Sequence, residues 1–455
     1  MDRIPLIASL PLLPPAARIP LTPLTLPILL SISPPVLLLA YLARRPNTQL
    51  LRLGILLLAG GWCLFVLTGC RWMSVEMGPW NFALGLYGLI VFAKTVEYAT
   101  YNDFKRLDEP ERGKTSTPTT GTNGSTKHSA NGHAKAHNRT AINGNGDPSP
   151  RPAPPTPLDT FRARLLDAVD LVSSLRGIGW AYGTGTFIPP FPFAHLSGPS
   201  LRRRWLLHAF LQFTLTFLLF DSFEVLLKQH PNFRAPGPAS MFLPSLPLLP
   251  RFFLVICTSL VTGIAVVLGF QSGYYFFAFL CVLLLGHDPR AWPPIQMDPW
   301  YATSLHDFWA RRWHQLLRRS FLVMGGYPMQ YPATLLFGKT AGDVAAVLGV
   351  FLASGMLHML AQYPIGMPLS WGSLQYFLLQ GVGVGLERVF RLVTGRRMSG
   401  VTGWLWTSGF VVVGGVLACE DWHLHGLGAG IVIPPALSPV RAVIIPLARR
   451  VMGES

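Results

Sequence analysis

Long apolar runs, separated by short polar or basic segments, dominate the hydropathy pattern of this chain. About 20 consecutive apolar residues are needed for a helix that crosses the hydrocarbon core of a bilayer. Runs of about that length or longer cover residues 24–43, 53–70, 77–93, 205–220, 252–286, 344–386, 398–419 and 426–448. Two of these runs have room for two helices each, with a break near Gly269 in one and at Pro364 in the other. The pattern predicts an all-α, polytopic transmembrane protein with about eight to ten helices.

The composition supports a membrane protein. Asp, Glu, Lys and Arg make up 13% of the 455 residues, about half the ~25% of an ordinary globular domain. So few charges cannot cover a water-exposed surface, and most of the surface is expected to contact lipid. The formal net charge of +16 would suggest nucleic acid in a soluble protein. Here it fits cytosolic loops rich in Lys and Arg, and no nucleic-acid partner is expected. Five cysteines without a CxxC spacing argue against a disulfide framework.

One region differs in composition from the rest. Residues 113–157 are rich in Gly, Ser, Thr, Asn, Pro and His, and such a stretch cannot bury enough apolar surface to offset its ordering entropy. We therefore divide the chain into N-terminal transmembrane helices at 1–101, a disordered low-complexity loop at 102–160 and a core at 161–455.

Basic residues cluster in four segments, which the positive-inside rule assigns to the cytosolic face. The segments are residues 44–52, 105–204, 290–339 and 388–397. A common face requires an even number of crossings between Arg204 and Arg290. Either residues 252–286 cross only once, or the proline-rich stretch 236–250 also enters the membrane.

His358 is a candidate functional residue, because an ionisable side chain at membrane depth is costly. It lies in the sequence FLASGMLHM (residues 351–359), with Ser354 four residues earlier on the same helical face. A neutral imidazole has a lone pair and suits a general base. A packing histidine that is hydrogen-bonded to another helix is the alternative.

A second candidate segment, SLHDFWARRWHQLLRRSF, covers residues 304–321 and follows WPP at 292–294. The prolines stop a helix, and Ser304 with Asp307 three residues later can start the next one. In an α-helix Asp307 would pair with Arg311. One face would then be mainly aromatic and the other polar, with Trp309, Trp313, Leu316 and Ser320 on the first and Asp307, Arg311, His314 and Arg318 on the second. We expect an interfacial amphipathic helix, which is either a topology anchor or a cavity wall whose arginines hold an anionic group.

Two weaker features carry less information. Residues 419–425, CEDWHLH, include metal-ligand types, but their spacing matches no familiar metal site. We expect a solvated polar turn there, and no metal. Most acidic residues near the span ends are expected to reach the membrane interface, and a few to line an internal tunnel; these residues are Glu97, Asp221, Glu224 and Glu387.

These segments resemble a known family. Residues 304–314 are similar to the S-L-x-D-F-W-G-R-R-W-[HN] signature of the wax-synthase-like branch of the membrane-bound O-acyltransferases, with Ala310 where Gly is usual. WPP at 292–294 and RGIGW at 176–180 resemble further elements of that branch. SGMLH at 354–358 is similar to the element that ends in the family's catalytic histidine. His314 takes the position at which sister families, with the motif F-Y-x-D-W-W-N, have Asn.

The resemblance implies acyl transfer from an acyl-CoA thioester to a hydroxyl, inside a tunnel through a many-helix membrane fold. It implies that His358 is the general base, whereas His314 either donates to the developing oxyanion or orients the acyl-CoA or His358. Ser354, activated by His358, is a minor alternative as a nucleophile. Contacts to CoA are expected from Arg311, Arg312, Trp313, Arg318 and Arg319, and tunnel-lining positions from Trp309, Ser354 and Asp307. Each arginine is equally compatible with a positive-inside anchor.

Within this branch we predict an O-acetyltransferase that uses acetyl-CoA as co-substrate and binds no permanent cofactor. The acceptor would be a hydroxyl of a lipophilic terpenoid or meroterpenoid in secondary-metabolite biosynthesis, entering from the endoplasmic reticulum bilayer. The RRWH form of the motif and the low-complexity loop favour this choice. A long-chain acyl-CoA:alcohol acyltransferase (wax ester synthase) is the first alternative. A secondary transporter is the second, although neither motif occurs in a second copy, as internal repeats would require.

Overall fold

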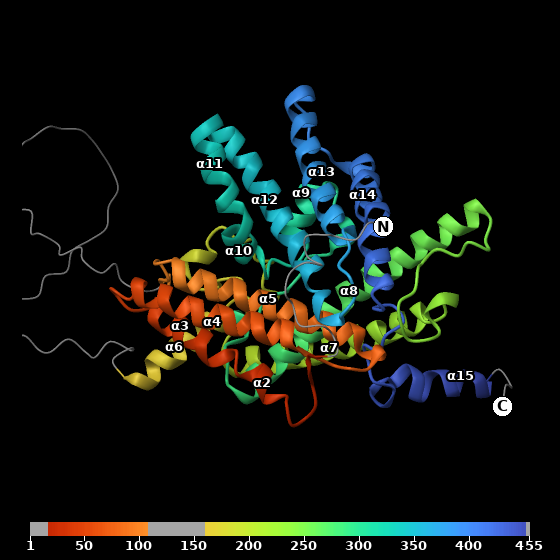
Figure 1. Cartoon of the computed structure of the whole chain (residues 1–455), viewed down its shortest axis with the longest axis horizontal. Helices are drawn as coiled ribbons and strands as arrows, with labels where there is room; N and C mark the ends of the chain where they lie inside the picture. Colours follow the sequence, from red (N-terminus) through yellow and green to blue (C-terminus); the bar gives the residue numbers. More distant parts are fainter. Residues whose placement is uncertain (1–16, 108–159, 452–455) are drawn as a thin grey trace, which may run out of the picture.

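A computed structural model describes residues 17–107 and 160–451 of the chain, and helices dominate these residues (Figure 1). The proposed low-complexity loop falls mostly on residues 108–159, outside the described residues, so the division into three regions stays a prediction. The described part contains six helices that are long and apolar enough to cross a membrane. They are α4 (Gln49–Gly69), α5 (Gly78–Thr100), α7 (Gly198–Leu227), α8 (Leu248–Leu284), α12 (Lys339–Leu360) and α14 (Gly400–Leu424). The predicted all-α polytopic membrane architecture is confirmed.

Further elements complete this architecture. The helices are α2 (Pro27–Leu30), α3 (Ser33–Ala43), α6 (Phe161–Ser173), α9 (Leu305–Asp307), α10 (Arg318–Phe321), α11 (Tyr327–Phe337), α13 (Gly372–Thr394) and α15 (Ile445–Val451). Two-residue strands, β1 (Ile19–Pro20) and β2 (Cys70–Arg71), pair in parallel. Figure 1 shows α11 with α12, and α13 with α14, as two hairpins that project from the body of the molecule.

The described residues hold fewer spans than the eight to ten that we expected. Residues 252–286 lie in one continuous helix, α8, of 37 residues. Gly269 does not act as a hinge: α8 continues through it, and the Phe220 ring of α7 packs against it. At 1.5 Å per residue α8 is about 55 Å long, so a single crossing exceeds the ~30 Å hydrocarbon core. The break predicted at Pro364 is confirmed, since α12 and α13 are separate helices. Residues 426–448 do not form a span.

As one continuous helix, α8 favours the first of the two possibilities for the basic segments. Helices α7 and α8 pack against each other, and Arg202 Nη2 donates to the carbonyl oxygen of Leu283 over 3.3 Å. Arg290 Nη2 donates to the carbonyl oxygen of Leu196 over 2.8 Å. Arg204 and Arg290 therefore lie at the same end of this helix pair, as a common face for the basic segments requires.

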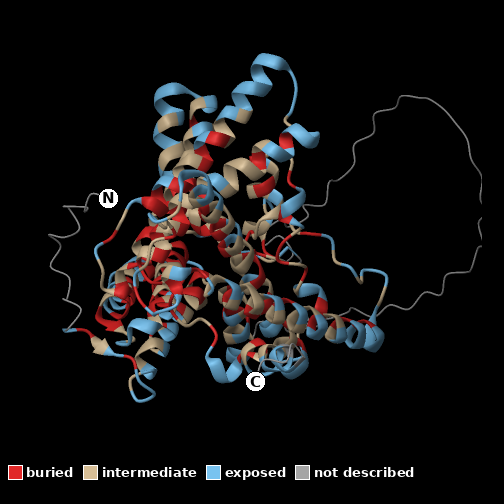
Figure 2. Cartoon of the chain, turned by 90° about the vertical axis from the view of Figure 1, so that its right-hand side faces the viewer, coloured by how far each residue is buried: buried red, intermediate tan, exposed pale blue. Residues whose placement is uncertain are grey.

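Apolar side chains cover the outward faces of the long helices. Leu57 and Leu58 of α4, Phe253 of α8 and Val401 of α14 are each more than two thirds exposed. Figure 2 shows buried residues concentrated in the interior and exposed residues on helix tips and outer faces. This distribution suits helices whose outer surface is solvated by lipid rather than water.

Candidate active site

His358 lies in the last turns of α12, and its ring orientation is set by its own helix. Its Nδ1 lies 2.8 Å from the carbonyl oxygen of Ser354. A carbonyl oxygen only accepts, so Nδ1 carries the hydrogen and the lone pair of the neutral ring is on Nε2. No described residue hydrogen-bonds to Nε2. The ring stacks on Phe377 of α13 at 4.5 Å between centroids and on Trp422 of α14 at 6.1 Å. Packing thus fixes the plane of an imidazole whose basic nitrogen has no protein partner.

The predicted amphipathic α-helix over residues 304–321 is wrong. The segment begins with the short α-helix α9, and a π-helical turn, η7 (Phe308–Arg312), follows. Trp313 is extended, and the next helix begins at Arg318. The expected ion pair of Asp307 with Arg311 is also wrong, because a π-turn aligns residues five apart. Asp307 Oδ2 pairs instead with Arg312 Nε at 2.5 Å.

Tertiary hydrogen bonds stabilise this turn. The buried amide of Gln315 donates to the carbonyl oxygens of Trp309 and Trp313 over 2.9 and 2.8 Å. At the start of α9, Ser304 Oγ accepts from the N–H of Asp307 over 3.0 Å, so the predicted Ser304 cap is confirmed. The carboxylate of Glu387, 82 residues away, accepts from the N–H of Leu305 over 2.6 Å.

Glu387 is a residue whose role the sequence did not suggest. Besides Leu305, it accepts from the N–H of His306 over 3.1 Å and from the indole of Trp406 over 3.0 Å. A carboxylate at a helix N-terminus satisfies free backbone donors and complements the helix dipole. Glu387 does not simply reach the interface, as we expected, but attaches the motif segment to α13 and α14.

The π-turn places His314 against α8 and within electrostatic range of His358. The His314 ring packs on Phe270 at 4.6 Å between centroids, and its Nδ1 is buried without a hydrogen-bond partner among the described residues. The pKa of His314 is lowered to about 3, mainly by burial, and the nearby charge of Arg176 contributes to the lowering. His314 is therefore a neutral imidazole at physiological pH.

A series of aromatic contacts connects the two histidines. Trp313 contacts His314 at 5.1 Å between ring centroids, and Trp309 contacts Trp313 at 5.8 Å. Trp309 also contacts Phe377 at 5.9 Å, the ring on which His358 stacks. Its indole N–H donates to the side chain of Gln380 over 3.1 Å. Trp309 and Trp313 thus lie between the histidines, and their predicted roles in the tunnel and at CoA stay predictions. Ser354 is buried beside His358, whereas Asp307 is occupied by Arg312.

Arg176 connects two of the motifs that the sequence analysis singled out. Its guanidinium donates to the carbonyl oxygens of Pro294 and Pro293 over 2.7 and 2.9 Å, and to the Tyr274 hydroxyl over 2.8 Å. The RGIGW and WPP elements therefore meet at one buried cation beside α8.

The four arginines of the motif segment fall into two groups. Arg312 pairs with Asp307 and donates to the carbonyl oxygen of Asp298 over 3.0 Å. Arg319 pairs with the buried Glu97 at 3.2 Å. The side chains of Arg311 and Arg318 make no hydrogen bond or ion pair with any described residue. The positive charges of Arg311 and Arg318 are therefore available to an anionic ligand.

The segment at residues 419–425 is not a solvated turn, as we expected. It continues α14, and Asp421 is fully buried. Asp421 accepts from the N–H and hydroxyl of Ser373 over 2.8 and 2.7 Å, from the amide of Gln362 over 2.7 Å, and from the Ser370 hydroxyl. Ser373 Oγ in turn accepts from the indole N–H of Trp422 over 3.0 Å. Asp421 thus supports the ring that stacks on His358. The absence of Gly, Pro and Asn from CEDWHLH could have indicated a continuing helix.

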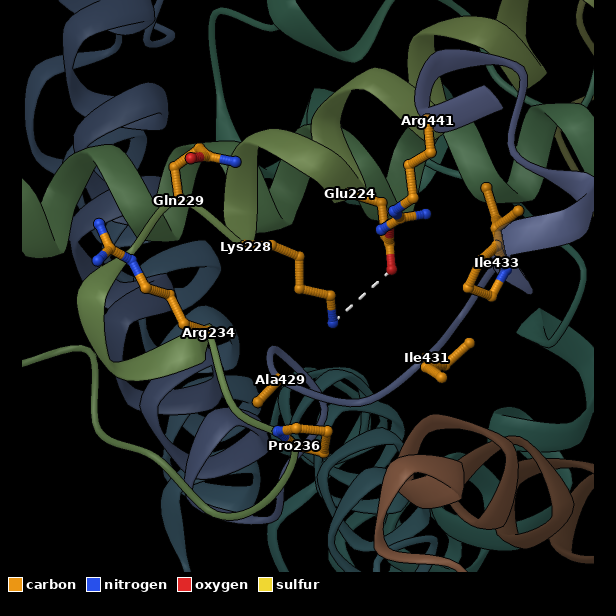
Figure 3. Close-up of a pocket in the computed structure, with 10 residues that line it drawn as sticks. Glu224, Lys228, Gln229, Arg234, Pro236, Ala429, Ile431, Ile433 and Arg441 are labelled. Atoms are coloured by element: carbon orange, nitrogen blue, oxygen red, sulfur yellow. Dashed lines mark hydrogen bonds and ion pairs between the residues drawn. The ribbon is translucent and has the colours of Figure 1, made fainter. Parts of the chain in front are cut away.

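Three of the four acidic residues near the span ends have a structural role. The prediction that such acids reach the interface is wrong for Glu97, Asp221 and Glu224, which are all buried. Glu224 pairs with Arg441 and lies 3.7 Å from Lys228 Nζ. Figure 3 shows these three side chains in a pocket of ≈390 Å³ at the end of α7. The Asp221 carboxylate, 3.7 Å from Arg441 Nη1, supplies a second negative charge, and these contacts attach the C-terminal segment to α7.

Neither this pocket nor a second one contains the histidines. The second pocket, of ≈520 Å³, is an apolar groove between α13 and α14, lined by residues such as Leu379 and Phe410. The internal tunnel therefore stays a prediction. Among the described residues, no cluster of three or more His, Cys, Asp or Glu side chains is arranged to hold a metal ion.

The chain is similar in sequence to several curated acyltransferases. Similar curated proteins include acetyltransferase atnC of Arthrinium sp, 28% identical over 51% of this chain and 54% of its own length. Acetyltransferase ple2 of Rhodocybe pseudopiperita is 26% identical over 57% of this chain and 66% of its own. Probable long-chain-alcohol O-fatty-acyltransferase 8 of Arabidopsis thaliana is 31% identical over 30% of this chain and 40% of its own. The chain spans about half the length of acetyltransferase atnC. No solved structure matches this chain.

The part of the chain that holds the candidate site also matches a family. Residues 292–379 match the sequence model of the membrane bound O-acyl transferase family. These residues include Trp309, His314 and His358, as well as the Phe377 ring between them. The match confirms the resemblance inferred from the motifs. Residues 292–379 of this chain are similar to the membrane bound O-acyl transferase family.

Proposed function

We propose that this protein is an acyl-CoA-dependent O-acyltransferase. The observation that carries the proposal is the pairing of two neutral histidines inside the family-matched segment. His358 offers a lone pair on Nε2, and His314 has a buried ring nitrogen without a partner. A base and a donor within one apolar, aromatic site are what transfer of an acyl group to an alcohol requires.

The reaction can be written with these residues alone. The hydroxyl of the acceptor gives its proton to Nε2 of His358 while its oxygen attacks the thioester carbonyl carbon. The carbonyl oxygen gains negative charge and accepts a hydrogen bond from His314. The C–S bond then breaks, the carbonyl re-forms, and the thiolate leaves as CoA with the proton from His358. No acyl-enzyme is formed, and the Ser354 carbonyl has only to hold the His358 ring.

The acyl group is proposed to be acetyl, and the acceptor a lipophilic terpenoid or meroterpenoid alcohol of secondary metabolism. Support comes from fungal relatives whose names include acetyltransferase, such as atnC and ple2. The long-chain-alcohol O-fatty-acyltransferase relatives from Arabidopsis thaliana favour wax ester synthesis as the second candidate. We place the protein in the endoplasmic reticulum membrane, with acyl-CoA approaching from the basic, cytosolic end and the alcohol from the bilayer.

The two groups of arginines should respond differently to replacement. Arg318→Ala and Arg311→Ala should each raise the KM for acyl-CoA several-fold and leave the unfolding temperature unchanged, because each removes an unpaired charge. Arg312→Ala should lower the unfolding temperature, since it leaves the Asp307 carboxylate without its partner. Differential scanning fluorimetry in detergent and initial rates over a range of acyl-CoA concentrations measure both effects. A normal KM in the Arg311→Ala/Arg318→Ala double variant would remove both residues from the CoA site.

Release of free CoA from microsomes that contain the protein tests the function directly. Acetyl-CoA and palmitoyl-CoA are each supplied with a pool of hydroxylated terpenoids and a pool of long-chain alcohols. We expect release with acetyl-CoA and a terpenoid. Release only with palmitoyl-CoA and a fatty alcohol would move the assignment to wax ester synthesis. No release above the level of microsomes without the protein, in any combination, would count against acyl transfer to either alcohol class.

A further inference from the structure

Three neighbouring side chains, His314 among them, have buried polar atoms without a hydrogen-bond partner among the described residues. Gln296 is only 5% exposed, and neither its Nε2 nor its Oε1 has a partner. The same is true of the indole Nε1 of Trp292 and of Nδ1 of His314. Buried side-chain amides in folded proteins are almost always hydrogen-bonded. Among the described residues Gln296 is the only buried side-chain amide with both atoms unpaired.

These groups lie along one face of α8. His314 packs on Phe270 at 4.6 Å between ring centroids, and Trp292 packs on Tyr274 at 5.6 Å. Phe270 and Tyr274 are four residues apart, so they occupy the same helix face about 6 Å apart. His314 and Trp292 are therefore neighbours along α8, with Trp292 nearer its C-terminal end.

Gln296 belongs to the same strip. The N–H of Met297, the next residue, donates to the carbonyl oxygen of Arg312 over 3.0 Å. This bond holds the chain at Gln296 beside the end of the π-turn, two residues before His314. On the other side, Arg176 holds the chain at Pro293 and Pro294. Residues 292–297 are thus fixed at both ends, with an unpaired amide between them.

The chemistry of the strip describes its ligand. Trp292 offers a donor, Gln296 both a donor and an acceptor, and His314 one ring nitrogen. Arg176, whose charge acts on His314, already donates to Pro293, Pro294 and Tyr274. A neutral, extended ligand with amide groups fits this set, because an amide presents a C=O and an N–H together to the Gln296 side chain. An alcohol acceptor has a hydroxyl and would satisfy Gln296 less completely.

The pantetheine arm of CoA has these properties, since it is uncharged and contains two amides and a hydroxyl. We propose that Gln296 binds a pantetheine amide of acyl-CoA. This inference rests on the proposed use of acyl-CoA and adds a contact that positions the thioester beside His314. The arm would run along α8, from the thioester at His314 past Gln296 toward Trp292.

The test compares Gln296→Met with the unmodified protein in detergent or nanodiscs. Methionine has similar volume but no amide. We expect the KM for acyl-CoA to rise roughly 10-fold, while kcat and the KM for the alcohol stay within about two-fold. The dissociation constant of free CoA should rise by a similar factor. The dissociation constant of adenosine 3′,5′-bisphosphate, which lacks the pantetheine arm, should not change.

Stability measurements distinguish a ligand contact from a structural role. Because its amide has no protein partner, Gln296→Met should not lower the unfolding temperature of the ligand-free protein. Gln315→Met is the matched control, since Gln315 is equally buried but its amide donates to the carbonyl oxygens of Trp309 and Trp313. This control should lower the unfolding temperature.

Each result decides one of the two proposals. Equal affinity of the Gln296→Met variant and the unmodified protein for CoA would overturn the pantetheine contact and leave the proposed activity intact. A lower unfolding temperature with unchanged CoA affinity would assign Gln296 a structural role. Failure of the unmodified protein to bind CoA at all would instead overturn the proposed function on which the inference rests.

Discussion

Replacing His358 with alanine is expected to reduce turnover by a factor of ~10²–10⁴, the usual contribution of a general base. An alcohol is a weak nucleophile while it keeps its proton, and Nε2 of His358 is positioned to remove that proton. Its lone pair is available because Nδ1 donates to the Ser354 carbonyl oxygen over 2.8 Å. The variant should still fold, because the ring makes only stacking contacts and one hydrogen bond within its own helix. Initial rates of CoA release, with expression normalised by immunoblot, measure the effect.

His208 provides a matched control for this experiment. It is also a histidine within a candidate span, α7, and it packs between Phe193 and Tyr275 at 5.3 and 5.8 Å between ring centroids. A packing histidine can be replaced at a cost in stability but not in chemistry, so His208→Ala should keep its turnover. If the His358→Ala variant also turned over at a near-normal rate, His358 would be a packing residue as well. The base would then have to be another group.

The long helices were predictable from the sequence because apolar length is a local property. The number of crossings was not, because length alone does not say whether a run bends. Gly269 looked like a hinge, but α8 continues through it, with the Phe220 ring of another helix packed against it. Pro364 did break the helix, since proline removes a backbone donor wherever it lies. The first effect depends on a packing partner and the second does not.

The candidate site shows the same limit. The motif sequences identified His314 and His358, but they did not predict the backbone conformation between Ser304 and Arg318. The π-turn depends on the Asp307–Arg312 pair and on Gln315, and its N-terminus is held by Glu387 from a different hairpin. Helical spacing predicts contacts only for a regular α-helix.

Asp421 was misread for a related reason. A polar cluster at the end of an apolar run resembles a solvated turn when its partners are unknown. Those partners are Ser373 of α13 and, in the connection between α12 and α13, Gln362 and Ser370. The network also sets the indole of Trp422 against His358. Residues that support a catalytic ring through hydrogen bonds carry no motif of their own.

Replacing His314 should separate a hydrogen-bond donor from a base. His314→Ala should lower kcat by ~10²–10³, the range found when one donor to a developing oxyanion is removed. His314→Asn should retain much more activity, because an amide N–H can still donate from nearly the same place. Both variants should change kcat more than the KM for acyl-CoA, since the bond strengthens as the carbonyl oxygen gains charge. Equal losses in the two variants would exclude the donor role.

The pH dependence of the His314→Asn variant adds an independent check. Burial lowers the pKa of His314 to about 3, so this ring is protonated only below that pH and stays neutral between pH 5 and 8. An asparagine amide is neutral over the same range. The pH profile of kcat in His314→Asn should therefore keep the shape of the unmodified protein's profile, scaled to a lower maximum. If an acid limb present in the unmodified protein disappeared in His314→Asn, His314 would titrate during turnover. It would then act as a proton acceptor rather than as a fixed donor.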